Sequence, residues 1–246
     1  MKILPLLAAA AFFLPASSAA QESGFKYGKI SGDELRMTSY APDPDAEAVF
    51  LYDDSYLNYD VGNKLVLELY RTARIKVLKS EGSRWGDVEI DYYSNNNAEE
   101  HVSRIEAASY NLVNGKEVRT PLKKQFIFEE ELDKNTRRIK FSIPEVREGS
   151  VIEYRYRVRS EFIGSIPTLY VQHAIPVMHS NVDVTIPWCF TFQAEICGDI
   201  QLDVERMLAY GSSTGSSKFR YKATRYVCKT ENVPALKEEP YVWCTD

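Results

Sequence analysis

Apolar and polar residues alternate with a period of two along much of the chain. In residues 65–78 one face is apolar except for Arg71, and the other carries Glu68, Thr72, Arg74 and Lys76. Residues 151–160 repeat the pattern, with apolar or aromatic side chains alternating with one glutamate and three arginines. This period is typical of half-buried β-strands. One wet face in turn favours an antiparallel sheet over a buried parallel one.

Turn residues connect these strands. Asn114-Gly115 predicts a two-residue hairpin between residues 109–113 and 116–119, because a type I′ turn requires positive φ twice. Residues 133–136 predict a second hairpin between 126–132 and 137–143. Further strands are expected at 48–52, 88–93, 168–175, 182–186, 190–196 and 218–229. The polar run 211–217 is expected to be a loop within the domain.

Helix signals are few. Ser31 and Glu34 form a capping-box pattern that predicts one or two helical turns through Met37. Residues 80–86 predict another turn. The pattern as a whole predicts an all-β protein, a large antiparallel β-sandwich with one or two short helical turns.

The N-terminus has the pattern of a secretory signal peptide. Lys2 is followed by the apolar run 3–14, Pro15 ends that run, and small residues precede a cleavage site after Ala20. We expect residues 1–20 to be removed and residues 21–246 to form one β-sandwich domain in the periplasm or outside the cell. An uncleaved N-terminal anchor is the alternative. No later apolar run is long enough to span a membrane.

Four cysteines lie in the last quarter of the chain: Cys189, Cys197, Cys228 and Cys244. None has the Cys-x-x-Cys spacing of a zinc or redox site. In an oxidising compartment they are disulfide candidates, with three possible pairings that sequence does not distinguish. Buried free thiols are the alternative.

Composition narrows the functional classes. The chain has 246 residues, 44% of them hydrophobic, and a formal net charge of −5. These values fit a globular protein with a full core. An acidic chain lacks the basic face that binding to nucleic acid requires, so no nucleic-acid partner is expected.

The most specific motif is the run 141–154, Phe-Ser-Ile-Pro-Glu-Val-Arg-Glu-Gly-Ser-Val-Ile-Glu-Tyr. Pro144 is expected to end a strand, and Gly149 to supply positive φ in a turn rather than a ligand loop. Other motifs occur in order around this run: 44–53, 74–82, 110–116, 175–177 and 232–241. Taken together, the chain resembles the domain of unknown function 3857, which occurs N-terminal to a transglutaminase-like core in secreted bacterial proteins.

The resemblance implies that this chain has a non-catalytic role. The cysteine-hydrolase-like reaction of such proteins belongs to the transglutaminase-like core, and no catalytic residue of that core has a counterpart here. We therefore expect a non-catalytic accessory or scaffold domain, with a downstream transglutaminase-like domain as possible partner and with no cofactor. The alternative is a stand-alone periplasmic module that binds a glycan or a peptide. A hydrolase acting by itself is a third and weaker hypothesis.

The histidines and Cys189 show no sequence pattern typical of a metal-binding or catalytic site. His173 and His179 have a spacing that would put them on one face but about 20 Å apart in a straight strand. Pro176 between them could bend the path, so a zinc pair is the alternative, and exposed or core-edge histidines are the expectation. His101 has no partner nearby in sequence, and no spacing supports a dyad of Cys189 with His173. We expect no catalytic, cofactor or metal residues.

Acidic and aromatic residues complete the list of candidates. Asp43, Asp45, Asp53, Asp54 and Asp60 cluster without a calcium-loop pattern, and residues 129–131 are three glutamates expected to be solvated. The aromatic residues are expected to pack in the core. Three tryptophans offer an alternative, a platform for sugar rings: Trp85, Trp188 and Trp243.

Overall fold

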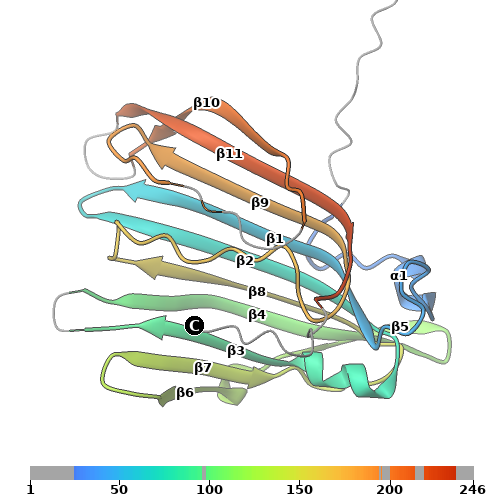
Figure 1. Cartoon of the computed structure of the whole chain (residues 1–246). Helices are drawn as coiled ribbons and strands as arrows, with labels where there is room; N and C mark the ends of the chain where they lie inside the picture. Colours follow the sequence, from blue (N-terminus) through green and yellow to red (C-terminus); the bar gives the residue numbers. More distant parts are fainter. Residues whose placement is uncertain (1–24, 96–97, 194, 196–199, 214–218, 237–246) are drawn as a thin grey trace, which may run out of the picture.

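The computed structural model describes residues 25–95, 98–193, 195, 200–213 and 219–236, and it consists mainly of two β-sheets (Figure 1). The helices are α1 (Gly32–Arg36), η1 (Ser80–Gly86) and η2 (Lys124–Phe126). The strands are β1 (Ala48–Val61), β2 (Leu65–Val77), β3 (Asp87–Tyr93), β4 (Glu100–Val113), β5 (Lys116–Pro121), β6 (Ile127–Glu131), β7 (Thr136–Ser142), β8 (Val151–Ser160), β9 (Val177–Pro187), β10 (Val204–Ser212) and β11 (Arg220–Val233).

The larger sheet has eight strands in the order β10-β11-β9-β1-β2-β8-β4-β5, and the smaller has three in the order β3-β7-β6. All paired strands run antiparallel except β1 and β9, which are parallel. A fully antiparallel sheet was therefore the wrong expectation for this one pair. Alternation reports which residues share a face and does not report strand direction. The chain enters β9 after the long connection 161–176, which brings it back beside β1 in the same direction.

The main core lies between the two sheets, as in a β-sandwich. Ala73 and Ile75 of β2 and Ile152 of β8 share one buried cluster with Ile90 of β3 and Phe141 of β7. In Figure 1 the small sheet lies at the β4 side of the large one. These contacts join inward-facing residues of both sheets, so the predicted all-β sandwich is confirmed.

Both predicted hairpins are present. Asn114 and Gly115 have φ of 52° and 73°, as a type I′ turn between β4 and β5 requires. In the turn between β6 and β7 the Asp133 carboxylate accepts from the backbone N–H groups of Asn135 and Thr136. These side-chain bonds satisfy donors that the hairpin leaves free.

The predicted helical turns are also present. The Ser31 hydroxyl accepts from Glu34 N, and the Glu34 carboxylate accepts from Ser31 N, so the capping box at α1 is complete. Leu35 of α1 packs in a second cluster with Val49 and Leu51 of β1, on the face of the large sheet that points away from the small sheet. Residues 80–86 form η1.

The sequence pattern failed at several elements. Residues 168–175 and the described part of 190–196 are not strands. Their apolar residues pack as loops: Ile175 lies in the main core, and Phe190 stacks on Tyr59 with ring centroids 5.0 Å apart. Burial in a loop and burial in a strand give the same short apolar run.

Strand β10 had no clear sequence signal. Most of its residues are exposed, so alternation does not mark it. The strand includes Gly211 and Ser212, the first two residues of the predicted loop 211–217. Gly211 has no side chain and so leaves room for the Tyr221 ring, since a Cβ built at Gly211 would lie 2.1 Å from a Tyr221 carbon. Residues 214–217 lie outside the described part of the chain. Strand β4 begins earlier than expected, at Glu100.

Candidate binding surfaces

The signature run 141–154 forms a turn whose polar atoms bind within the protein. Strand β7 ends before Pro144, and Gly149 has φ of 85°. The Ser150 hydroxyl donates to Asn111 Oδ1 (2.6 Å), and Asn111 Nδ2 donates to Glu145 O (3.0 Å). These bonds tie the turn to β4 and support the structural interpretation of the run.

Buried charges next to this turn correct the expectation of a wet face on β2 and β8. Arg74, Lys76 and Glu153 are all but fully buried beneath the N-terminal segment. Arg74 Nη2 lies 2.6 Å from Glu153 Oε1, and Arg74 Nη1 lies 2.7 Å from Glu34 Oε1. Lys76 Nζ donates to the carbonyl oxygens of Leu35 and Gly149, and burial lowers the pKa of Lys76 to about 8. Alternation marked this face as polar but did not show that residues 25–46 cover it.

Arg71, the exception on the apolar face of β2, belongs to a second buried cluster. Its Nη2 lies 2.7 Å from Asp53 Oδ1, and His173 Nε2 lies 2.5 Å from Asp53 Oδ2. The rings of Tyr154 and Tyr156 stack with centroids 6.5 Å apart, and burial raises the pKa of both hydroxyls. The side chains of Arg71, Asp53 and His173 thus each have a partner inside the sandwich.

The two histidines considered for zinc lie in different surroundings. His173 contacts Asp53 and Phe50, whereas His179 stacks on Tyr52 and lies 3.5 Å from Glu231. His101 is exposed on β4. Within the described ranges no group of three His, Cys, Asp or Glu side chains could hold a metal ion.

The structure does not bring Cys189 and His173 together. Cys189 is exposed just after β9 and lies near Tyr59, because burial and then the neighbouring Cys189 raise the pKa of the Tyr59 hydroxyl. His173 instead contacts Asp53. Tyr59 and Asp53 are six residues apart on β1, which is about 20 Å along a strand. A nucleophile and its base need hydrogen-bond contact, so this pair cannot form a dyad.

The disulfide candidates are only partly visible. Cys228 is buried on β11, Cys189 is exposed, and the two are not bonded to each other. Cys197 and Cys244 lie outside the described residues. Pairings that involve them stay predictions.

The clustered carboxylates are dispersed by the fold. Asp53 is buried in the cluster with Arg71, whereas Asp43 and Asp45 lie in the connection before β1. Burial and the neighbouring Asp53 raise the pKa of Asp54 to about 6. Of the glutamates on β6, Glu129 accepts from the Tyr92 hydroxyl and Glu130 pairs with Lys140.

The tryptophan platform, which the sequence left as an alternative to core packing, has no support in the described residues. Trp85 packs against the core, and its indole N–H donates to Glu47. Trp188 is 73% exposed after β9. Trp243 lies outside the described part of the chain.

A groove of about 810 Å³ lies instead over the open face of the large sheet, away from the small sheet. Tyr56 of β1 is opposite Tyr70 of β2, with ring centroids 6.0 Å apart, and Tyr210 of β10 is 54% exposed. The charged side chains that line the groove are Asp60, Glu68, Arg104, Arg157 and Arg225. Sequence reasoning missed this site because its tyrosines lie on four strands, of which β10 and β11 are distant along the chain from β1 and β2.

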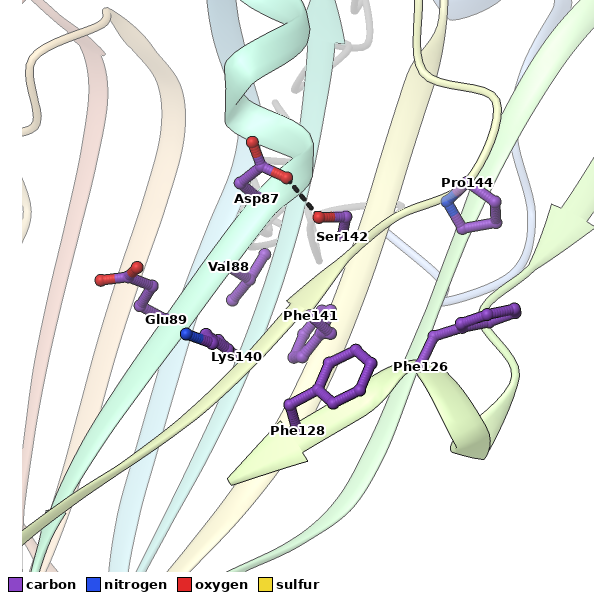
Figure 2. Close-up of a pocket in the computed structure, with 9 residues that line it drawn as sticks. All are labelled: Asp87, Val88, Glu89, Phe126, Phe128, Lys140, Phe141, Ser142 and Pro144. Carbon is purple, nitrogen blue, oxygen red and sulfur yellow. Dashed lines mark hydrogen bonds between the residues drawn. The ribbon is translucent and has the colours of Figure 1, made fainter. Parts of the chain in front are cut away.

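A smaller pocket of about 600 Å³ lies on the outer face of the three-stranded sheet (Figure 2). Phe126 and Phe128 line it together with Pro144 and are 47% and 55% exposed. Figure 2 shows the Phe126 ring below Pro144. Asp87, which accepts from the Ser142 hydroxyl (2.6 Å), and Lys140 add polar groups at the opposite side.

Residues 67–202, more than half of the chain, match the family described as a domain of unknown function with solved-structure structure, DUF3857. The chain belongs to the DUF3857 family. The matched range contains the signature run 141–154, whereas the motifs at 44–53 and 232–241 lie outside it.

A solved structure of a bacterial protein has a similar fold. This DUF3857 chain is similar to a crystal structure of a "putative protease" from Parabacteroides distasonis, with a TM-score of 0.52 and 13% identity. The similarity covers 81% of this chain and 38% of that one, so the chain spans well under half of its relative. An M1 zinc metallopeptidase from Deinococcus radiodurans aligns at a TM-score of 0.31 and 10% identity, over 79% of this chain and 45% of that one. No curated protein matches the sequence.

Proposed function

We propose that this DUF3857 chain is a non-catalytic accessory domain of an exported transglutaminase-like protein, and that it docks to the transglutaminase-like domain through the phenylalanine pocket. The observation that carries the proposal is the exposure of Phe126 and Phe128 around one pocket. Neighbouring exposed apolar side chains around a depression are typical of an interaction site. The occupant is suggested by the family resemblance and by the Parabacteroides structure, in which the matched part is 38% of a longer chain.

The arrangement of ionisable groups also supports a role without chemistry. His173, which has a carboxylate partner, is held in an internal cluster with Asp53 and Arg71. Cys189, which follows β9, lies near Tyr59, and Tyr59 is about 20 Å along β1 from Asp53 of that cluster. Among the described residues, the exposed Cys189 therefore does not lie beside His173 as a nucleophile must lie beside its base.

A turnover assay tests the non-catalytic part of the proposal. The purified chain is incubated with amine donors and glutamine-containing peptides, and separately with unfolded casein. We expect no product above the buffer background. Turnover by this chain that is lost in Cys189→Ser or His173→Ala would show a catalytic site within it.

Export is part of the same proposal. We expect cleavage after Ala20 and a mature N-terminus at Gln21, in the periplasm or outside the cell. N-terminal sequencing of the protein recovered from the native cell envelope checks this, and a retained Met1 would argue for an anchor. Among the described residues no helix has the length and hydropathy to cross a membrane.

A second candidate function is supported by the tyrosine-lined groove. The aromatic rings and polar side chains of that groove suit a glycan. In this role the chain is a module that binds a cell-envelope glycan, by itself or beside a catalytic domain.

A further inference from the structure

We infer that the groove on the open face of the large sheet binds an acidic oligosaccharide, and that Arg104 binds its carboxylate. This inference deepens the second candidate function and rests on it. Three features of the groove carry it: the unpaired guanidinium of Arg104, the tyrosine pair on β1 and β2, and the position of the groove on a sheet face.

Arg104 differs from the other arginines of the groove. Arg157 contacts Glu68 and Ser103, and Arg225 forms a bidentate pair with Asp183. The guanidinium of Arg104 has no hydrogen bond or ion pair within the described part of the chain, and the residue is exposed. An arginine whose planar fork is free in a groove is suited to a bidentate carboxylate.

The backbone holds Arg104 in an unusual conformation. Its φ is 56°, and the register of β4 against β8 shifts between Ser103 and Glu106. A bulge redirects a side chain, and positive φ costs free energy in a residue with a side chain. The strain is therefore located where it aims a free positive charge into the groove.

The tyrosines supply the surface for sugar rings. Tyr56 and Tyr70 lie opposite each other, and the C–H groups of a pyranose face pack against such rings. Strand β4, which carries Arg104, is three strands away from β1, about 14 Å across the sheet. A ligand that touches both ends is an oligomer and not a single sugar.

The position of the groove favours a glycan over a peptide. An extended peptide gains most of its affinity from main-chain hydrogen bonds at a free strand edge. Here the backbone groups of β1, β2 and β8 are already used in the ladder on both sides. A ligand over these three strands can bind only side chains, and the groove offers tyrosines, arginines, the two carboxylates of Asp60 and Glu68, and hydroxyl or amide groups.

Calorimetry with matched ligands tests the inference. The probes are trimers of galacturonic acid and of mannuronic acid, the methyl esters of both, and triglutamate. We expect one acid trimer to bind at least tenfold more tightly than its ester, and Arg104→Asn to remove this difference. Asparagine tolerates positive φ, so this variant keeps the bulge. Tyr56→Ala should weaken acid and ester alike.

Two controls separate this inference from the docking proposal. Arg147→Asn removes an exposed arginine in the 143–150 turn and should leave binding unchanged. Phe128→Asp disrupts the phenylalanine pocket on the other sheet and should also leave it unchanged. Equal affinity for acid and ester, binding of triglutamate alone, or no heat from any sugar at 10 mM would overturn the inference.

Discussion

Three charged residues lie buried under α1 on the face opposite the main core: Arg74 and Lys76 of β2 and Glu153 of β8. Glu153 accepts from Arg74 Nε and Nη2 and from the backbone N–H of Gly28. Because these groups have left water, each depends on its partner for compensation. The signature residue Glu153 therefore joins the N-terminal segment to the sheet.

Replacing Glu153 alone should strongly lower the free energy of unfolding. Glu153→Leu leaves the Arg74 guanidinium with one carboxylate in a buried site, and we expect a loss of about 3–5 kcal/mol in the free energy of unfolding. Glu106→Leu is the matched control, since Glu106 pairs with Arg155 on the exposed surface and should cost no more than about 1 kcal/mol. Urea denaturation measures both. Equal losses would contradict the role given to the buried pair.

The raised pKa of Asp54 predicts that the stability of the fold depends on pH. Its pKa rises from 3.8 to about 6 on folding, so the folded state binds the proton more tightly than the unfolded state does. Stability therefore falls as pH rises from about 4 to 6, and the penalty is complete above pH 6. Asp54→Asn should raise the free energy of unfolding at pH 7.5 by up to roughly 3 kcal/mol, because a tenfold change in proton affinity is worth about 1.4 kcal/mol.

The gain should shrink as pH falls through 6 toward 4, as measured by urea denaturation at pH 7.5 and 4.5. Glu131→Gln, an exposed carboxylate on β6, is the control and should show no such trend. A gain from Asp54→Asn that is the same at both pH values would contradict the assignment.

At the scale of elements, turn chemistry was the most reliable sequence signal. Asn114-Gly115, the capping box at Ser31 and the glycine at 149 all have the geometry that their residue types predict. These signals are local, since each depends on a few neighbouring residues. Strands were harder to predict than turns. Residues 168–175 are largely apolar but do not form a strand, and β10 is a strand without an apolar face. In both cases residues far along the chain decide the structure.

Gly149 offers a direct test of turn strain. A Cβ at this position would meet nothing within 4 Å, so Gly149→Ala isolates the cost of its φ of 85°. We expect a loss of about 1–2 kcal/mol in the free energy of unfolding. Gly164→Ala also meets open space, and its φ lies outside the positive range, so it should change stability by less than about 0.5 kcal/mol. Thermal or urea unfolding of the two variants compares them.

Strand β10 is one edge of the large sheet and carries exposed apolar residues, with Leu208 68% exposed. Unpaired backbone groups beside apolar side chains promote pairing with another copy. Leu208→Lys should lower self-association at high concentration without lowering stability, as light scattering would show. Leu236→Lys changes an equally exposed leucine outside the strands and should have no such effect.

At the scale of the whole molecule, the sequence predicted the fold class and the family but not the surfaces. The sandwich follows from alternation, and the DUF3857 family from the ordered motifs. The groove combines Tyr56, Tyr70, Arg104 and Tyr210, and strand order alone brings them together. Arg71 had a visible sequence signal, since it interrupts an apolar face, and it pairs there with Asp53.

Cross-linking in the native bacterium tests the central claim most directly. A photoreactive phenylalanine analogue replaces Phe128 at the phenylalanine pocket or, as control, Leu112, an exposed residue of β4. The account predicts that mass spectrometry of the product from position 128, but not from 112, identifies peptides of a transglutaminase-like domain. Cross-links from 128 only to unrelated proteins, or equal cross-links from both positions, would contradict it.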